Sequence, residues 1–231
     1  MGACLVRLGF GPNCFAGKVR VCSDTVMTET ITDVATGEAA RPRTIWTGDK
    51  VVLRAYEPED WESERLFDDS VDQRSGWKIW PPRSDLANRQ WSEKAAAEQP
   101  EGEVLKFRLA IARRTDRVLV GNVNVHSVDQ TNGTFMYGIA VGAEHKGNGY
   151  AGEAILLVMR YMFDERRFQK CEAGVFDYNE ASLALHRKLG FVEEGRLRRH
   201  IFSGGRYHDD VRFGMTVEEF HELYPKLRPV L

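Results

Sequence analysis

The stretch GIAVGAEHKGNGYAGEAI, residues 138–155, joins an apolar run of strand-forming residues to a helical pattern through a glycine-rich loop. Apolar side chains after the loop share one helical face: Ile155, Leu156, Met159, Met162 and Phe163. A helix that begins in this way exposes unpaired N–H groups and the positive end of its dipole. Because glycines let an anion approach the backbone closely, the stretch predicts a phosphate-binding site.

Two kinds of phosphate ligand are compatible with the loop. Residues 147–152 read as GxGxxG, which is the fingerprint of dinucleotide-binding sheets. In those sheets the strand runs almost directly into the first glycine, near the start of a doubly wound domain. Here residues 140–146, AVGAEHK, intervene, and the unit lies late in the chain with a single parallel crossover. NAD or FAD is therefore the weaker interpretation, and another pyrophosphate is favoured.

Outward from the loop, hydrophobic periodicity and turn residues predict the order β-α-α-β-β-β-α-β-α-β-β. The strand over 135–141, the helix after the loop and the strand over 170–176 form one parallel β-α-β crossover. Three helix starts carry capping residues: Ser84, Asn179 and the pair Thr216 and Glu219. The fold class is therefore α/β (α+β), with a mixed, mostly antiparallel central sheet.

Composition excludes several classes of function. Lys and Arg number 32 against 34 Asp and Glu, so the net charge is −2, which gives no basic footprint for nucleic acid. No apolar run approaches the ~20 residues that span a bilayer. The four cysteines, at positions 4, 14, 22 and 171, form no CxxC pair. We therefore expect neither a metal site nor a disulfide framework, and the reducing cytoplasm as the location.

The chain divides into a tail and one domain. Residues 1–44 show no sustained period and are punctuated by Pro and Gly, which is typical of a flexible N-terminal extension. Met27 opens the most polar part of this extension, so residues 1–26 are interpreted as an upstream translation or a leader. Residues 45–231 contain the patterned segments and are predicted to form a single domain.

Three motifs in order resemble one family. The stretch over 138–155 is similar to the acyl-CoA motif of the GNAT superfamily of N-acetyltransferases, a strand followed by Q/R-x-x-G-x-G/A at the start of a helix. NEASLALHRKLGFVEEG, residues 179–195, resembles its second motif, and GGRYHDDVRFGM, residues 204–215, resembles the closing strand of the RimJ/RimL-like branch. The resemblance implies the GNAT fold and transfer of an acetyl group from acetyl-CoA to an amine in a ternary complex.

The resemblance also implies which residues hold acetyl-CoA. The pyrophosphate is expected at the backbone N–H groups of the loop: Lys146, Gly147, Asn148, Gly149, Tyr150 and Ala151. The pantetheine arm is expected along Ile139, Ala140 and Val141, as an added strand. One N–H group of this strand would polarise the thioester carbonyl. Asn179 has two interpretations, a bond to the pantetheine arm and a plain helix cap.

The acid and base are less clearly marked. Many relatives carry a Glu where this chain has Met136, so the usual base is missing. His126 alternates with valines on a predicted strand and is the substitute candidate, with a solvated strand face as the alternative. Ser182 is the first candidate for protonating the leaving thiolate, and His186 is the second.

The acceptor remains open. Trp77 and Trp80 lie between the first two helices, where they would enclose an amine or simply pack the helix pair. A protein N-terminal amine and a small-molecule amine are both compatible. Succinyl-CoA as the donor, a non-catalytic acyl-CoA-binding sensor, and a homodimer stay as alternatives at this level.

Overall fold

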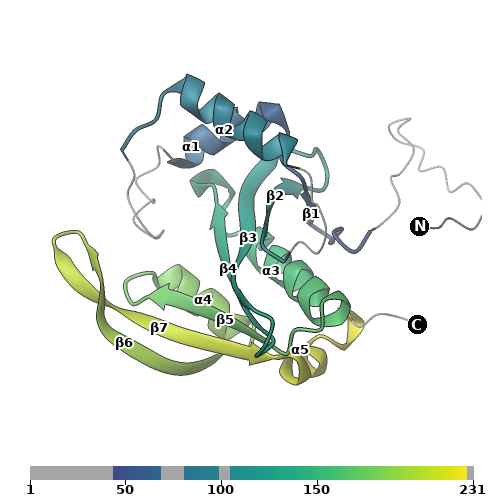
Figure 1. The fold of residues 1–231 in the computed structure, drawn as a ribbon, viewed down its shortest axis with the longest axis vertical. Coiled ribbons are helices and arrows are strands. Elements are labelled where there is room, and N and C mark those ends of the chain that lie inside the picture. The colour runs from purple at the N-terminus through teal and green to yellow at the C-terminus, as the bar shows by residue number, and fades with distance from the viewer. Residues whose placement is uncertain (1–43, 69–80, 99–104, 228–231) are drawn as a thin grey trace, which may run out of the picture. The chain divides into compact units, whose positions relative to one another are not determined.

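The computed structural model describes residues 44–68, 81–98 and 105–227. The predicted extension over residues 1–44 therefore falls, apart from Thr44, outside the described residues. The described chain forms a seven-stranded sheet in the order β1-β2-β3-β4-β5-β7-β6 (Figure 1). Its strands are β1 (Val51–Arg54), β2 (Phe107–Arg113), β3 (Leu119–Asp129), β4 (Thr134–Val141), β5 (Lys170–Phe176), β6 (Val192–Ser203) and β7 (Arg206–Thr216).

Pairing within the sheet is antiparallel throughout, except that β4 and β5 are parallel. The predicted fold class, a mixed and mostly antiparallel sheet with one crossover, is thus confirmed. The helices are α1 (Trp61–Asp68), α2 (Asp85–Ala97), α3 (Tyr150–Arg160), α4 (Glu180–Lys188) and α5 (Val217–Leu223). Short 3-10 turns cover Pro58–Asp60, Ala143–His145 and Pro225–Leu227, and a π-helical turn, Tyr161–Glu165, extends α3.

The predicted caps determine where three helices begin. Ser84 accepts the N–H of Ala87, and Asn179 accepts the N–H of Ser182. At α5 the capping box is complete, because Thr216 and Glu219 each accept the other's backbone N–H. Each cap satisfies a donor that the first helical turn leaves unpaired.

The main core lies between the sheet and α3. Alternate residues of β3, Val123 and Val125, are buried with Phe135 of β4 against Ile155 and Met159 of α3. A smaller cluster on the other face packs Tyr56, Ala110 and Leu119 under Trp91 and Ala95 of α2. Figure 1 shows α1 and α2 together over the β2–β3 part of the sheet. One face of the sheet is therefore filled by α3, while the opposite face is covered by helices over its first strands.

Parallel pairing between β4 and β5 is short. It joins Thr134 to Lys170, Phe135 to Cys171 and Met136 to Glu172, and ends there. Beyond this point β4 remains paired with β3 as far as Val141, while β5 remains paired with β7 as far as Phe176. We call this divergence the β4–β5 opening. The backbone edge of β4 from Tyr137 to Val141 is about 13 Å long at ~3.3 Å per residue.

A side-chain contact attaches the start of the domain to α3. The Glu153 carboxylate accepts the backbone N–H groups of Asp49, Lys50 and Val51 at 2.7, 2.8 and 2.7 Å. Gly48 leaves room for it, because a Cβ there would stand 2.5 Å from the carboxylate carbon. One side chain in the first turn of α3 thereby accepts hydrogen bonds from three backbone N–H groups, two just before β1 and one at its first residue.

We predict that Glu153→Gln lowers the free energy of unfolding by about 2–3 kcal/mol, because the amide loses the charge and turns an NH2 group toward backbone donors. Urea denaturation measures the change. Glu62→Gln, in an exposed position of α1, is the control and should stay within ~0.5 kcal/mol of the parent. Equal losses in both variants would contradict the role given to Glu153.

Candidate active site

The glycine loop presents the N-terminus of α3. Gly147 and Gly149 adopt φ values of 79° and 83°, in the left-handed region that favours glycine. Gly149 is the N-cap and has no side chain with which to bond the first turn of this 11-residue helix. Asn148 braces the loop by donating its amide to the carbonyls of His145 and Lys146 at 3.0 and 3.3 Å. The unpaired N–H groups of the first turn therefore lie at an exposed, braced loop.

Cationic side chains accompany this loop. The Lys50 ammonium donates to the carbonyl of Asn148 at 2.8 Å, and Lys146 is exposed within the loop itself. Arg113, on β2, holds Asp116 at 2.6 Å, and its pKa is raised by that bond and by a hydrogen bond with Tyr150. Positive side chains and the positive end of the α3 dipole thus coincide, which is the arrangement that a pyrophosphate requires.

The β4 edge carries the second part of the site. The N–H of Gly142 bonds to the carbonyl of Val120, and this bond shows which residues of β4 direct their backbone groups toward β3. In an antiparallel pair alternate residues direct their backbone groups to opposite sides. Tyr137, Ile139 and Val141 therefore direct theirs toward the β4–β5 opening, whereas Ala140 faces β3. Of the three residues predicted to align the pantetheine arm, Ile139 and Val141 have the suitable orientation.

The predicted acid candidates meet on α4. The Oδ1 atom of Asn179 accepts the Ser182 N–H at 3.1 Å, and the Ser182 hydroxyl lies 3.4 Å from Nδ1 of His186. That nitrogen also lies 2.7 Å from the Ser182 carbonyl, which can only accept, so Nδ1 carries the ring proton. Nε2 then accepts the Tyr137 hydroxyl at 2.8 Å. The plain-cap interpretation of Asn179 is observed, while its bond to pantetheine stays a prediction.

His186 is an interior residue with 3% of its surface exposed. Its ring stacks on Phe213 and meets Phe191 edge-on. Burial lowers the pKa of His186, so the imidazole is neutral at pH 7. The ring links α4 to β4 through Tyr137, and its single proton points at Ser182.

The polar residues of β3 lie on the face opposite α3. Asn124 accepts the Gly138 N–H at 2.8 Å, and His126 is half-buried with Nδ1 3.0 Å from the Ser127 hydroxyl. Burial also lowers the pKa of His126. Asn122 donates to Glu64 of α1 at 3.3 Å. Sequence reasoning missed Glu64, because the two residues stand 58 positions apart and no local pattern joins them.

Two predicted residues cannot be placed. Trp77 and Trp80 lie outside the described residues, so their acceptor role stays a prediction. Within the described parts of the chain, no group of His, Cys, Asp and Glu is arranged to hold a metal ion. In those same parts, no helix has the length and apolarity to cross a bilayer.

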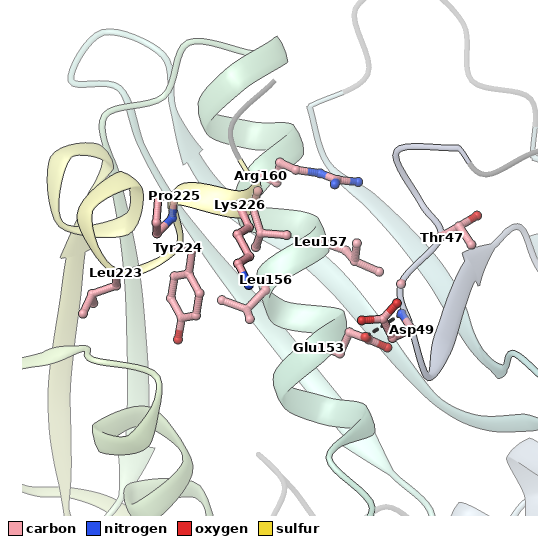
Figure 2. A pocket seen from close by; sticks show the side chains of 12 residues that line it. Thr47, Asp49, Glu153, Leu156, Leu157, Arg160, Leu223, Tyr224, Pro225 and Lys226 are labelled. Atoms are coloured by element: carbon pink, nitrogen blue, oxygen red, sulfur yellow. Dashed lines mark hydrogen bonds between the residues drawn. The ribbon is translucent and has the colours of Figure 1, made fainter. Parts of the chain in front are cut away.

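A cavity of about 670 Å³ lies on the outer side of α3 and contains none of the predicted site residues (Figure 2). Figure 2 shows Leu156, Tyr224 and Lys226 facing one another there, with Glu153 and Asp49 at another side. Its size falls in the range of small-molecule sites. The loop and the β4 edge do not line it, so it is separate from the candidate active site. Its lining comprises Thr47, Gly48, Asp49, Glu153, Leu156, Leu157, Arg160, Leu223, Tyr224, Pro225, Lys226 and Leu227.

Comparison with known proteins agrees with this geometry. The Acetyltransferase (GNAT) domain matches residues 50–192. The chain belongs to the GNAT acetyltransferase family. It is 41% identical over 177 residues to the SPbeta prophage-derived uncharacterized N-acetyltransferase YokL of Bacillus subtilis, covering 77% of this chain and 96% of that protein. It is 25% identical to the [Ribosomal protein uS5]-alanine N-acetyltransferase of Escherichia coli, covering 78% and 94%.

Among solved structures, the fold is shared with spermidine N-acetyltransferase from Vibrio cholerae in complex with CoA and spermine. The TM-score is 0.63 at 22% identity, with 75% of this chain and 99% of that chain covered. The protein is therefore a GNAT N-acetyltransferase, and the family uses acetyl-CoA. The dinucleotide interpretation of the glycine loop is set aside by this membership.

We predict that Gly149→Ala weakens acetyl-CoA binding about tenfold, because a left-handed alanine costs ~1–2 kcal/mol and shifts the loop away from its present form. Isothermal titration measures the dissociation constant. Gly149→Asn should lose less, since Asn tolerates this conformation. Gly195→Ala, with open space around its Cβ position, is the control. Equal affinity in Gly149→Ala and the parent would contradict the prediction.

We predict a pH-dependent contribution of His186 to stability. Since its folded pKa is lowered, the unfolded chain takes up the proton first, so the contribution is full above ~6.5 and is lost as pH falls toward the folded value. The free energy of unfolding of His186→Gln should therefore fall less steeply below pH 6.5 than that of the parent. His200→Gln, at an exposed position, should keep the parental slope. Identical slopes in all three proteins would refute this.

Proposed function

We propose that the protein transfers an acetyl group from acetyl-CoA to a primary amine by direct attack in a ternary complex. The observation that carries this proposal is the β4–β5 opening, which places the free edge of β4 directly before the exposed N-terminus of α3. The loop from Lys146 to Ala151 would take the pyrophosphate, and the edge would pair with pantetheine as an added strand. An outward N–H group at Ile139 would polarise the thioester carbonyl.

Proton transfers are assigned to three residues. His126, neutral because burial lowers its pKa, would take a proton from the acceptor ammonium. The neutral amine then attacks the acyl carbon, and the carbon–sulfur bond breaks. Ser182 would give its hydroxyl proton to the leaving thiolate and would take up the second proton, which the amine nitrogen loses as the amide forms. His186, 3.4 Å from that hydroxyl through its protonated Nδ1, would orient the hydroxyl as a positioning residue.

The names of similar proteins support a primary amine as the acceptor. Similar proteins include enzymes named for an alanine of ribosomal protein uS5 and for spermidine N(1), that is, for a protein and for a polyamine. We propose a place in the RimJ/RimL-like branch, with the cytoplasm as the location. Trp77 and Trp80 are proposed to border the acceptor.

One experiment tests the donor. Thermal unfolding is followed with acetyl-CoA, succinyl-CoA and NAD in parallel, since a ligand of the folded state raises apparent stability. Stabilisation by acetyl-CoA, followed by release of free CoA thiol on addition of an amine, is the expected result. Stabilisation by NAD alone would overturn the proposal, and thiol release from succinyl-CoA alone would change the donor.

We predict that Ser182→Ala lowers kcat by roughly 10²–10⁴, because the leaving thiolate loses its proton donor. Acetyl-CoA affinity should stay near that of the parent, which separates chemistry from binding. Steady-state thiol release and titration give the two quantities. Ser203→Ala at the end of β6 is the control. An unchanged kcat in Ser182→Ala would remove this residue from the mechanism.

A further inference from the structure

Glu172 stands at the point where β4 and β5 part. It is the last residue of β5 that pairs with β4, opposite Met136. Its neighbours Cys171 and Ala173 are buried in the core beside α3. Since side chains alternate along a strand, Glu172 projects from the other face of the sheet, where it is half-buried.

On that face Glu172 completes a row across three strands. His126 of β3 pairs with Met136 of β4, and Met136 pairs with Glu172 of β5. Directly paired residues project to the same side, so the imidazole and the carboxylate flank the methionine. The next residues of this face toward the opening are Gly138 and Gly174. The side chains over these two glycines are polar, because the Asn124 amide lies over Gly138 and the Asp210 carboxylate lies over Gly174.

Two cations on this face are paired with other carboxylates, while Lys106 lies close enough to His126 to help lower its pKa. Lys170 contacts Glu194 at 2.8 Å, and Arg212 contacts Asp210 at 2.9 Å. Among the described residues, the Glu172 carboxylate forms no hydrogen bond or ion pair, although its backbone lies in the sheet. Its nearby cation, Lys170, has its pKa raised first by Glu194 and only secondarily by Glu172.

Glu64, above the same face, is held differently. Its carboxylate accepts the Tyr56 hydroxyl at 2.5 Å and the Asn122 amide at 3.3 Å. Asp210 lies closer to the opening, over Gly174, but it is buried and paired with Arg212. Glu172 is instead half-buried, and its carboxylate has no such partner among the described residues. A carboxylate in such a position attracts an ammonium group.

We propose that Glu172 binds the ammonium group of the acceptor over Met136, beside His126, and that the substrate is accordingly a cationic aliphatic amine. This inference rests on the proposed acetyl transfer and names the residue that recognises its acceptor. Glu172 accepts hydrogen bonds from the ammonium group, and His126 receives the proton that leaves.

The first test separates binding from chemistry. In Glu172→Gln the KM for an alkylamine should rise roughly ten- to hundredfold, because a charge-assisted hydrogen bond is lost. The values of kcat and of the KM for acetyl-CoA should stay near the parental ones, which a general structural defect would not allow. Glu222→Gln, exposed on α5, is the matched control and should change neither KM. A parental amine KM in Glu172→Gln would overturn the proposal.

The second test uses the unaltered protein, so it holds even if Glu172→Gln fails to fold. An alkylguanidinium and the alkylurea of the same shape are compared as inhibitors of amine acetylation. The guanidinium should compete with the amine and bind roughly tenfold or more tightly than the uncharged urea. Equal inhibition by the two would overturn the assignment of Glu172.

The outcomes also distinguish the two proposals. If no amine releases CoA thiol from acetyl-CoA, the proposed function fails, whatever the inhibitors do. If thiol is released but the charged and uncharged inhibitors act alike, acetyl transfer stands and the role of Glu172 is wrong.

Discussion

The early end of hydrogen bonding between β4 and β5 is the constraint on which the site depends. Past Met136 and Glu172, each strand keeps one antiparallel partner, so the sheet stays intact on both sides of the opening. A row of backbone groups on β4 is left without a strand partner there. Such groups favour an extended ligand that can bond to them. The binding edge is therefore an interruption of sheet pairing, made tolerable by the antiparallel pairs beside it.

Hydrogen bonds within the core stabilise β4 next to the β4–β5 opening. Tyr137, just past the last parallel pair, donates its hydroxyl hydrogen to Nε2 of His186 on α4, and the Nδ1–H group of His186 donates to the Ser182 carbonyl. Phe191 and Phe213 enclose the ring. Because every polar atom of the imidazole has a partner, its burial avoids the cost of an unsatisfied group. Where β4 and β5 no longer bond to each other, a helix thus connects to β4 through a side chain.

Local patterns predicted the elements, while long-range register decided the site. Ser84, Asn179 and Thr216 could be identified as caps because the interaction spans a few residues, and the crossover followed from periodicity around the glycine loop. The residue at which β4 and β5 part depends on the pairing of β4 with β3 and of β5 with β7. No short stretch of sequence determines these pairings. Sequence reasoning missed the Glu64–Asn122 contact and the bonds from Glu153 to the start of β1 for the same reason. Burial of His186 had one available signal, its position three residues after the apolar Leu183 on the same helical face.

Charge is distributed along β4 in a way that suits the two reactants. Lys50, Lys146 and the start of α3 lie at its carboxyl end, beyond Val141. The row with Glu172 crosses it near Met136, about 16 Å earlier by strand rise. An anionic donor anchored at one end and a cationic acceptor held at the other would meet along the free edge between them, where the outward backbone groups lie. The same interruption of pairing then supplies both the length that pantetheine needs and the point at which an amine can approach the thioester.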